Sequence, residues 1–472
     1  MDKRNVAIVG AGEAGVELAR ELGKHPSLGY HLVGFVDDAA DKQGKKVQGV
    51  SVIGTIEDLE TLITKHHIQE VLIAIPSAQG SLIRKIINQC QNAHVIFRIV
   101  PRVLEIIQGK VHMDQVRPVQ PEDVLGRAIR QYDQKVLEQL VQGKRVLVTG
   151  AAGSIGSELC RQLLQFHPEH LVMLDWWENG LFELDQEFSQ TYPNSKRKSV
   201  IGSIQDKQKM DWLLRETKPQ LFFHAAAFKH VPLMEDHPEE AVKNNIIGTR
   251  ICAEMAALHQ VEKFVFISTD KAVNPQSVMG ASKLFAELLV GDFNTQSQTK
   301  FISVRFGNVL GSYGSVVPIF QKQIAQGGPV TVTDPAMVRY FMTIPEAVQL
   351  ILQAAYHGKG GEVFMLDMGE PVKVIDLART LIRLSGFEPD KEIAIKIIGK
   401  RPGEKLVEEL LTSKEQVDRT AYDRLFVTKN GIAIGRDRLW ISFDRLTKLA
   451  DQQDKQGILK ELKTILPNFI RS

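Results

Sequence analysis

The chain has 472 residues, of which 43% are hydrophobic and 24% charged, and its formal net charge is +2. At about 100–200 residues per domain, this length predicts two or three folded domains rather than a disordered chain. The nearly balanced charge and the lack of a dense Lys/Arg block argue against nucleic acid as a partner.

The three cysteines, Cys90, Cys160 and Cys252, are widely spaced, fit no metal pattern and are typical of buried side chains in a reducing compartment. No metal site and no disulfide framework are therefore expected. The start, MDKRNVAIVG, lacks the apolar core of a signal peptide, and no window of about 18 apolar residues occurs that would span a membrane. We expect a cytoplasmic protein with no membrane span in this chain.

The first elements in chain order are a strand, a glycine-rich turn and a helix in NVAIVGAGEAGVELAREL, with Gly10, Gly12 and Gly15 spaced as GxGxxG. A second apolar run, HLVGFVDD, ends in Asp37 and Asp38. This is the βαβ dinucleotide fingerprint, in which a pyrophosphate lies on a helix N-terminus and an acid accepts ribose hydroxyls. The loop is interpreted either as a nucleotide site or as a tight turn only.

Apolar runs in GVSVIGTIEDL, IQEVLIAIPS and HVIFRIVP, with a helix around LIRKIINQC, complete an α/β domain expected over residues 1–127. The polar, helix-like residues 128–143 are predicted to link it to a second domain over 144–472.

The second domain begins with the same design in RVLVTGAAGSIGSELCRQLL, followed by HLVMLD with Asp175. Its glycines have the GxxGxxG spacing of short-chain dehydrogenases, which makes a dinucleotide site the favoured interpretation. The residues expected to contact the cofactor in this loop are Gly150, Gly153, Ser154, Ile155 and Gly156.

Seven strands alternate with helical segments in the second domain, which predicts a mostly parallel, doubly wound sheet with helices on both faces. The expected strands are 145–149, 170–175, 198–202, 220–225, 263–269, 301–309 and 362–367. Residues 368–472 are expected to form a mixed tail with a strand near 424–428. The tail ends in a helix, ILKELKTIL, whose apolar stripe faces the core.

Two strand ends should form the site, because ligands bind beyond the carboxyl ends of strands in such sheets. One ends in HAAAFKHVPLME, where Ala225, Ala226 and Ala227 either make room for a dinucleotide or pack tightly. The other ends in STDKA and precedes a helix with Lys283. A short-chain dehydrogenase would have a tyrosine four residues before that lysine, but this chain has Met279. Either this is an enzyme whose reaction does not use the tyrosine, or the fold has lost its catalytic activity.

From 145 to about 411, the chain resembles the extended short-chain dehydrogenases that act on nucleotide sugars. It is most similar to the large, CapD-like branch of UDP-N-acetylglucosamine 4,6-dehydratases in polysaccharide and protein-glycan biosynthesis. Residues 1–127 resemble the extra N-terminal Rossmann-like, nucleotide- or CoA-binding-like domain of that branch. The matching strings are TGAAGSIGSEL, HAAAFKHVPLME, NNIIGT, STDKAVNP, MGASK, RFGNVLGSYGSVVP, RYFMTIPEA, LDMGEPVK and RPGEK.

This resemblance implies an α/β protein with two Rossmann-like, doubly wound parallel-sheet domains, the second with a smaller C-terminal substrate lobe. It implies a hydro-lyase that uses NAD and a UDP-sugar, forms a 4-keto-6-deoxy product with retention at C5, and self-associates. Members of the branch have methionine at the position of Met279. They usually carry N-terminal membrane helices as well, so this chain would be a naturally soluble relative or a shortened one.

The resemblance also assigns catalytic roles. Asp270 would be the acid for the C6 hydroxyl, Lys271 the base for C5, and Thr269, with Ser268, the partner of the C4 hydroxyl. A lysine base near neutral pH needs a pKa about three below its usual value. Burial and the charge of Lys283 are the expected causes. Neutral Lys271 with protonated Asp270 has the same proton count as the ion pair, so the two would titrate together.

The cofactor and substrate contacts are implied in the same way. Lys283 would bind the nicotinamide ribose, Asp175 the adenosine ribose, which favours NAD over NADP, and Asp206 the adenine. The family more often has an aspartate where this chain has Ser203, which weakens the expectation for the adenine contacts. The UDP end would meet Lys229, His230, Asn308, Arg339 and Arg401, although His230 is equally well interpreted as structural.

Two other functions remain open. A nucleotide-sugar C4-epimerase shares the fold and NAD, but normally uses the tyrosine missing at 279 and needs no acid–base pair at 270–271. A scaffold that binds NAD and nucleotide sugar without turnover would explain Met279, but not the retained Asp270, Lys271 and Lys283. The first domain would be a nucleotide sensor or an assembly module.

Overall fold

The structure, a computed structural model, describes residues 3–78, 80–100, 113, 116–125, 134–410, 416–420, 424–429 and 434–470. Contacts divide the chain into two compact units. Unit 1 comprises residues 1–131 and 379–394, and unit 2 comprises residues 132–378 and 395–472. Part of the predicted linker, residues 128–133, lies outside the described residues, and its remainder contains helix α5 (Gln134–Val141).

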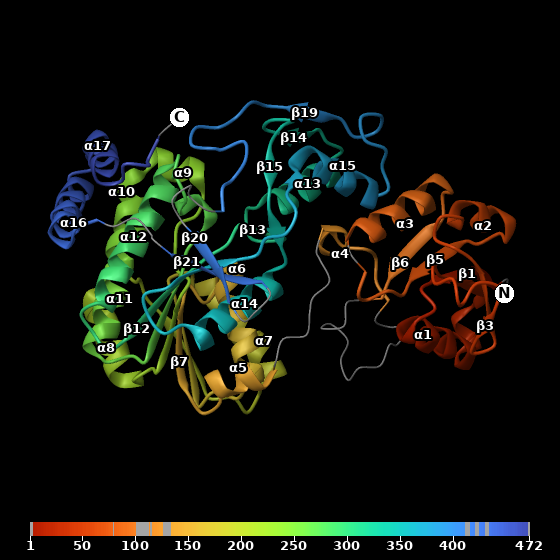
Figure 1. The fold of residues 1–472 in the computed structure, drawn as a ribbon, viewed down its shortest axis with the longest axis horizontal. Helices are drawn as coiled ribbons and strands as arrows, with labels where there is room; N and C mark the ends of the chain where they lie inside the picture. Colours follow the sequence, from red (N-terminus) through yellow and green to blue (C-terminus); the bar gives the residue numbers. More distant parts are fainter. Residues whose placement is uncertain are drawn as a thin grey trace. The chain divides into compact units, whose positions relative to one another are not determined.

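Unit 1 is an α/β unit whose described strands form a sheet in the order β3-β4-β2-β1-β5-β6 (Figure 1). Neighbouring strands are parallel except for β3 and β4, which are antiparallel. The strands are β1 (Arg4–Val9), β2 (Tyr30–Val36), β3 (Lys46–Val47), β4 (Val50–Gly54), β5 (Glu70–Ile73) and β6 (Ile96–Ile99). The helices are α1 (Glu13–Lys24), α2 (Leu59–Lys65), α3 (Gly80–Asn92) and α4 (Pro121–Leu125), with a 3-10 turn at Pro26–Leu28.

Unit 2 is built on a larger sheet, whose described strands follow the order β20-β21-β17-β12-β11-β10-β7-β8-β9. From β9 to β17 all neighbours are parallel, whereas β21 and β20 are antiparallel additions at one edge. The α/β class and the doubly wound parallel sheet predicted from the sequence are therefore confirmed. The strands are β7 (Arg145–Thr149), β8 (His170–Asp175), β9 (Arg197–Ile201), β10 (Leu221–His224), β11 (Lys263–Ile267), β12 (Lys300–Arg305), β17 (Val363–Leu366), β20 (Gln416–Arg419) and β21 (Leu425–Lys429).

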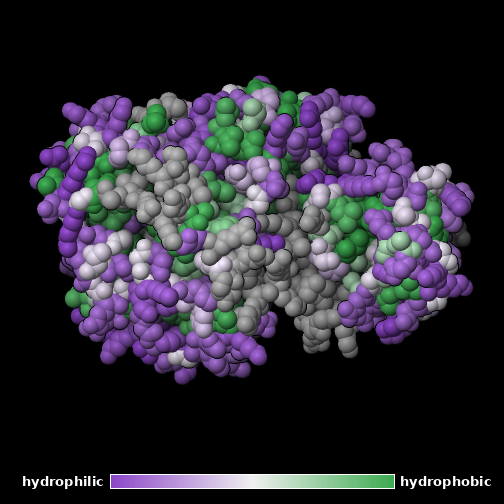
Figure 2. Space-filling view, viewed as in Figure 1, coloured by the Kyte–Doolittle hydropathy of each residue, from purple (hydrophilic) through white to green (hydrophobic). Residues whose placement is uncertain are grey.

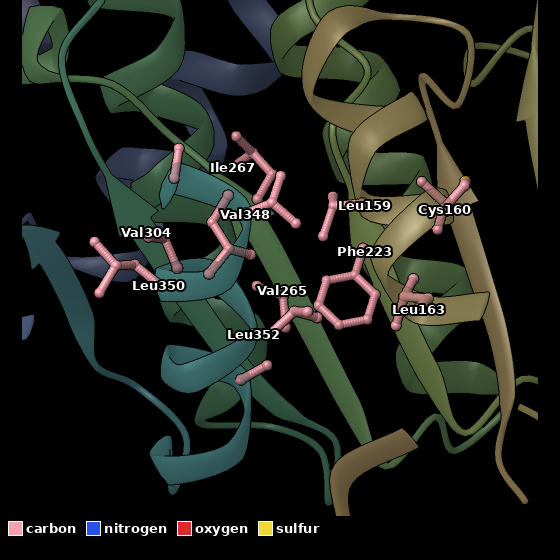
Figure 3. Packing of buried hydrophobic residues seen from close by; sticks show 14 of the residues in the cluster. Leu159, Cys160, Leu163, Phe223, Val265, Ile267, Val304, Val348, Leu350 and Leu352 are labelled. Carbon is pink, nitrogen blue, oxygen red and sulfur yellow. The ribbon is translucent and has the colours of Figure 1, made fainter. Parts of the chain in front are cut away.

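Helices cover both faces of this sheet because strand side chains alternate between the faces. Val146 and Val148 of β7 face one hydrophobic cluster, and Leu147 faces the other. Figure 3 shows the first cluster, where Leu159 and Leu163 of α6 (Ser154–Gln165) and side chains of α14 (Ile344–His357) meet the sheet. Helices α5 and α7 (Glu178–Thr191) share that face, while α8 (Lys207–Thr217), α11 (Thr249–Leu258) and α12 (Val278–Asn294) cover the other.

A third cluster joins α12 to the C-terminal helices α16 (Arg436–Asp451) and α17 (Lys455–Ile465). Ile458, Leu462 and Ile465 are buried in it, which confirms that the apolar stripe of the last helix belongs to the core. The short elements α9 (Val231–Asp236), α10 (Pro238–Ala241) and the π-helix η5 (Val242–Gly248) also contribute to this cluster.

One predicted strand divides in the structure. The run 301–309 forms β12, which ends at Arg305, and a separate β13 (Asn308–Val309), which pairs with β16 (Phe341–Met342) instead of the main sheet. Further short pieces are β14 (Val330–Val332) with β19 (Ile395–Ile397), β15 (Val338–Arg339) with β18 (Val372–Lys373), and helices α13 (Val316–Ala325) and α15 (Val374–Leu384).

On the face shown in Figure 2, hydrophilic side chains cover most of the described surface, and hydrophobic ones form small separate groups. Among the described residues, every helix is too short or too polar to cross a bilayer.

Candidate active site

The glycine-rich loop of unit 2 is packed so closely that it requires glycine at two positions. Gly150 has φ +68°, and a Cβ there would lie 2.6 Å from the backbone nitrogen of Ala226. A Cβ on Gly156 would lie 2.0 Å from the carbonyl oxygen of Gly150. The loop therefore lies against the end of β10 and leads directly into α6, so the N-terminus of that helix is available to an anion such as a pyrophosphate.

A cavity of about 1000 Å³ opens at the carboxyl ends of the unit 2 strands. It brings together most of the residues expected from the sequence. Those that line it are Gly150, Gly153, Ser154, Ile155, Gly156, Ala225, Ala227, Lys229, His230, Thr269, Lys271, Met279, Lys283, Asn308, Arg339 and Arg401. The size is suited to a cofactor or a drug-sized ligand, for which cavities of roughly 300–1,000 Å³ are usual.

Asp175, Asp206, Ala226 and Asp270 do not belong to the cavity lining. The carboxylate of Asp175 accepts hydrogen bonds from the backbone N–H groups of Ala152, at 2.9 Å, and Trp177, at 3.0 Å. It fixes the glycine loop, and its remaining lone pairs are still able to accept ribose hydroxyls. Asp206 caps α8 by accepting from the Lys209 N–H at 2.9 Å. Its suggested role at the adenine stays a prediction.

The predicted acid–base pair lies at the end of β11, in the 3-10 turn η6 (Asp270–Ala272). Lys271 Nζ donates to Asp270 Oδ1 at 3.0 Å and to Asn308 Oδ1 at 3.1 Å. The Thr269 hydroxyl donates to the same Asp270 oxygen at 2.9 Å. Asp270 is 1% exposed, and its Oδ2 has no hydrogen-bond partner among the described residues. A hydroxyl, a carboxyl and an amine are thus in direct contact beside the cavity.

Two further charged side chains complete this cluster. Glu408 Oε1 lies 3.7 Å from Lys271 Nζ and 3.9 Å from Arg339 Nε. Arg339 also donates to the backbone oxygens of Val338, at 2.8 Å, and Leu406, at 3.1 Å. Glu408 was not predicted from the sequence, although it follows the matching string RPGEK by three residues, because nothing in one sequence indicates that this carboxylate faces Lys271.

The expected direction of the Lys271 pKa is wrong. Burial does act to lower the pKa of Lys271, but the charges of Asp270 and Glu408 outweigh it and raise the pKa above its usual value. In the described structure Lys271 is therefore a charged ammonium. The expectation counted burial and the charge of Lys283 and did not include Glu408.

Lys283, in contrast to Lys271, has a lowered pKa. Burial brings the pKa of Lys283 down to about 7, an effect that Glu287 opposes in part. Its Nζ donates to the Ile267 carbonyl at 2.6 Å and lies 3.9 Å from the centre of the Phe266 ring. Met279, one helical turn earlier in α12, lines the cavity with a thioether, which cannot transfer a proton.

The residues predicted for the UDP end all line the cavity. Lys229 and His230 are exposed at its margin, where a Cβ on Gly314 would lie 2.5 Å from the His230 ring. The partial burial of the His230 ring against the cavity margin, with the charge of Lys229, lowers the pKa of His230. Arg401 is also exposed, and its backbone N–H donates to Glu404 at 3.1 Å. The exposed cations Lys229 and Arg401 are available to phosphate oxygens.

The glycine loop of unit 1 repeats this construction. Gly10 has φ +107°, and a Cβ on Gly15 would lie 1.9 Å from the Gly10 oxygen. Asp37 accepts from the N–H groups of Ala11, at 2.7 Å, and Ala39, at 2.9 Å, and also from Lys42 Nζ, at 3.3 Å. The lysine contact distinguishes Asp37 from Asp175.

The comparisons with known proteins match the N-terminal and C-terminal parts of the chain to different families. Residues 2–101 match a family described as a CoA-binding domain. The capsular polysaccharide biosynthesis protein CapD of Staphylococcus aureus is 45% identical over 90% of this chain and 72% of its own length. A UDP-N-acetylglucosamine 4,6-dehydratase (inverting) of Campylobacter jejuni is 34% identical over 58% of this chain and 80% of its own. A UDP-glucose 4-epimerase of Rickettsia prowazekii is 32% identical over 68% and 95%.

Among solved structures, Pen from Bacillus thuringiensis is similar, with a TM-score of 0.57 and 36% identity over 61% of this chain and 90% of its own. A family described as polysaccharide biosynthesis protein matches residues 146–430, which include the glycine loop, the Asp270–Lys271 turn and Glu408. The chain therefore belongs to the polysaccharide biosynthesis protein family.

Proposed function

We propose that this chain dehydrates a UDP-N-acetylhexosamine, in the first instance UDP-N-acetylglucosamine, to a 4-keto-6-deoxy sugar nucleotide with retention at C5. The observation that carries the proposal is the 3.0 Å contact between Lys271 Nζ and Asp270 Oδ1 beside a cavity that the glycine loop also lines. A base and an acid in contact suit the loss of a proton from C5 and of water from C6. The similarity to a 4,6-dehydratase (inverting) of Campylobacter jejuni supports this class of substrate. Retention at C5 is proposed instead from the resemblance to the branch that has methionine at the position of Met279.

NAD is the cofactor that suits the site. The tight Gly150 and Gly156 loop leaves the start of α6 open to a pyrophosphate, and an acid at Asp175 disfavours the extra phosphate of NADP. When bound, NAD would take a hydride from C4 of the sugar and return it to C6, so the reaction is redox-neutral. Lys283 lines the same cavity and would hold the nicotinamide ribose through the Nζ that now meets Ile267.

The protein's own groups would move the protons. Thr269 Oγ1 would hydrogen-bond the C4 hydroxyl, while Met279 takes no part in proton transfer. Transfer of one proton from Lys271 Nζ to Asp270 Oδ1 creates a neutral amine and a carboxylic acid without exchange with water. The amine then takes the C5 proton, Asp270 gives its proton to the C6 hydroxyl, and water leaves.

Lys271 then gives one of its ammonium protons to C5; in deuterated water this is mostly a deuteron, because the amine hydrogens exchange with the solvent. The proton that leaves the C4 hydroxyl during oxidation would pass to water, and the pair would regain one proton from water at the end of the cycle, so the atoms and charges balance. Cationic Lys229, Arg339 and Arg401 would bind the diphosphate end and keep the sugar over the pair.

The test is an NMR time course of the full chain with UDP-N-acetylglucosamine in deuterated water, without added reductant. The expected result is a new C6 methyl signal with deuterium at C5, lost in Lys271→Ala and Asp270→Asn. An unchanged sugar spectrum from protein that has NAD bound would refute this substrate and favour a non-catalytic scaffold or another nucleotide sugar.

A C4-epimerase is the second candidate, favoured by the similarity to the epimerase of Rickettsia prowazekii. Against it, Met279 replaces the hydroxyl that such an enzyme would use at C4. In the same experiment an epimerase would give the C4 epimer without a methyl signal and without deuterium at C5.

A further inference from the structure

The segment that carries Glu408 is fixed against the acid–base turn by several independent contacts. Lys405, which is buried, donates from Nζ to the Val273 carbonyl just after η6, at 2.9 Å. The Val338 N–H donates to the Leu406 carbonyl at 2.8 Å, and Val407 forms a parallel bridge with Val338. These contacts hold Glu408 opposite Lys271 even though the two residues lie far apart in the sequence.

Glu408 is a buried carboxylate that is able to accept further hydrogen bonds. It is 5% exposed and lines the cavity, and its Oε2 has no hydrogen-bond partner among the described residues. A buried carboxylate is costly unless a cation compensates it, and here Lys271 and Arg339 do so. A buried carboxylate of this kind is expected where its negative charge is needed by the functional site.

The ammonium of Lys271 has three hydrogens and three acceptors around it. Asp270 Oδ1 and Asn308 Oδ1 are within hydrogen-bond distance, and Glu408 Oε1 lies 3.7 Å away, at ion-pair distance. If the proton toward Asp270 moves, Asn308 still accepts a hydrogen bond from the amine, and the negative charge of Glu408 remains beside it. The lone pair of the amine then lies on the side of Asp270.

We propose that Glu408 is a positioning residue for Lys271, which keeps the single proton of the Asp270–Lys271 pair in the site and orients the amine toward C5. This inference rests on the proposed dehydration. Without the charge of Glu408, Lys271 would lose its proton to water at a lower pH. Asp270 would then have no proton to give to the C6 hydroxyl, and elimination would stop.

The charged groups that face Lys271 come from four parts of unit 2: Asp270 in η6, Glu408, Arg339 in β15, and Lys229 before α9. The two carboxylates raise the pKa of Lys271 against burial, and Arg339 opposes them. Replacing Glu408 by glutamine removes one of the two groups that raise the pKa of Lys271. The rate should therefore begin to fall at a lower pH on the alkaline side.

The experiment compares Glu408→Gln, Glu408→Asp and Glu409→Gln with the wild type. Glu409 is the matched control, because it is next in sequence but bonds Asn274 and Lys405 instead of Lys271. Two quantities are measured: kcat from the NMR methyl signal across pH 6 to 10, and the titration of Lys271 across pH 6 to 12 in protein labelled with 13Cε-lysine, because the wild-type pKa of Lys271 is raised above its usual value. The Lys271 signal is assigned by its absence in Lys271→Arg. Thermal unfolding and NAD binding confirm that each variant is folded.

We expect Glu408→Gln to lower kcat at pH 8 to 9 at least about tenfold, with little change in KM and a smaller loss at pH 6. Its Lys271 titration should move to lower pH, whereas Glu408→Asp should keep it near the wild-type position and Glu409→Gln should change neither quantity. A Lys271 titration or a kcat profile that is unchanged in Glu408→Gln would overturn the inference. If the wild type does not dehydrate the sugar, the proposed function fails, and the titration alone decides whether Glu408 keeps the proton on Lys271.

Discussion

Substituting Gly280 by alanine should damage the site through the backbone of Lys271. Gly280 lies in the first turn of α12, and a Cβ there would be 2.2 Å from the Lys271 carbonyl oxygen. Ordinary contact begins near 3.5 Å, so the helix and the turn would have to separate by on the order of 1 Å. Overpacking of this kind costs about 1–3 kcal/mol, and the better helix propensity of alanine returns at most about 1 kcal/mol.

We therefore expect Gly280→Ala to lower the free energy of unfolding by roughly 1–2 kcal/mol in urea titrations. It should also lower the dehydration rate roughly 100-fold, because a misplacement of about 1 Å has that effect on a reacting group. Gly291→Ala in the same helix is the control, since no described atom lies within 4 Å of a Cβ there. It should stabilise the chain by up to about 1 kcal/mol and leave the rate unchanged. If Gly280→Ala and Gly291→Ala change the free energy of unfolding and the dehydration rate to the same extent, the close packing of α12 on the acid–base turn is refuted.

Three further results are expected. Lys271→Ala and Asp270→Asn should each reduce dehydration at least about 100-fold while NAD binding, measured by fluorescence titration, is retained; loss of NAD binding would contradict their assignment. Because burial lowers the pKa of Lys283 to about 7 from 10.5, the unfolded chain binds more protons between these values. The free energy of unfolding without NAD should rise with pH across that window, by up to about 1.4 kcal/mol per pH unit, and Lys283→Met should flatten the rise. Burial likewise lowers the pKa of His224 to about 3 from 6.5, so this residue should make stability fall as the pH drops below 6.5. His224→Gln should weaken that fall in urea unfolding at pH 5 and 6.5, and an unchanged fall would show that other groups cause it.

Most of the fold of unit 2 could be predicted because parallel strands buried on both faces are short apolar runs bounded by turns and helices. The runs at 145–149 and 170–175 coincide with β7 and β8. The division of the predicted strand 301–309 into β12 and β13 could not be predicted, because the backbone changes its hydrogen-bonded partner strand within this run. The Asp270 N–H bonds the Phe306 carbonyl, and two residues later Asn308 bonds Tyr340 in a different small sheet. Hydrophobicity along the chain carries no information about which strand a backbone group will meet.

The site could be predicted where its residues lie at strand ends or in one helix. Thr269, Asp270 and Lys271 follow β11 directly, and the helical spacing of Met279 and Lys283 places both on one face of α12. Glu408 could not be predicted from that logic, because it follows no strand of the main sheet. It reaches Lys271 through the pairing of Leu406 and Val407 with β15 and the contact of Lys405 with Val273.

Glu408, which could not be predicted from the sequence, changes how the chemistry must be understood. Burial alone suggested a neutral Lys271 ready to act as a base, and burial does act in this way on Lys283, where Glu287 compensates it only in part. Around Lys271, two carboxylates reverse the outcome, so the chain without substrate holds its acid–base pair as an ion pair with one shared proton. A neutral Lys271 beside an ionised Asp270 would have a base but no acid, and elimination needs both at once. The raised pKa of Lys271 is therefore compatible with its proposed role as a base, provided that the proton moves to Asp270 inside the site and not to water. Substrate binding would then have to supply the free energy for that internal transfer, since water is displaced from around the pair and the C6 hydroxyl becomes available to Asp270.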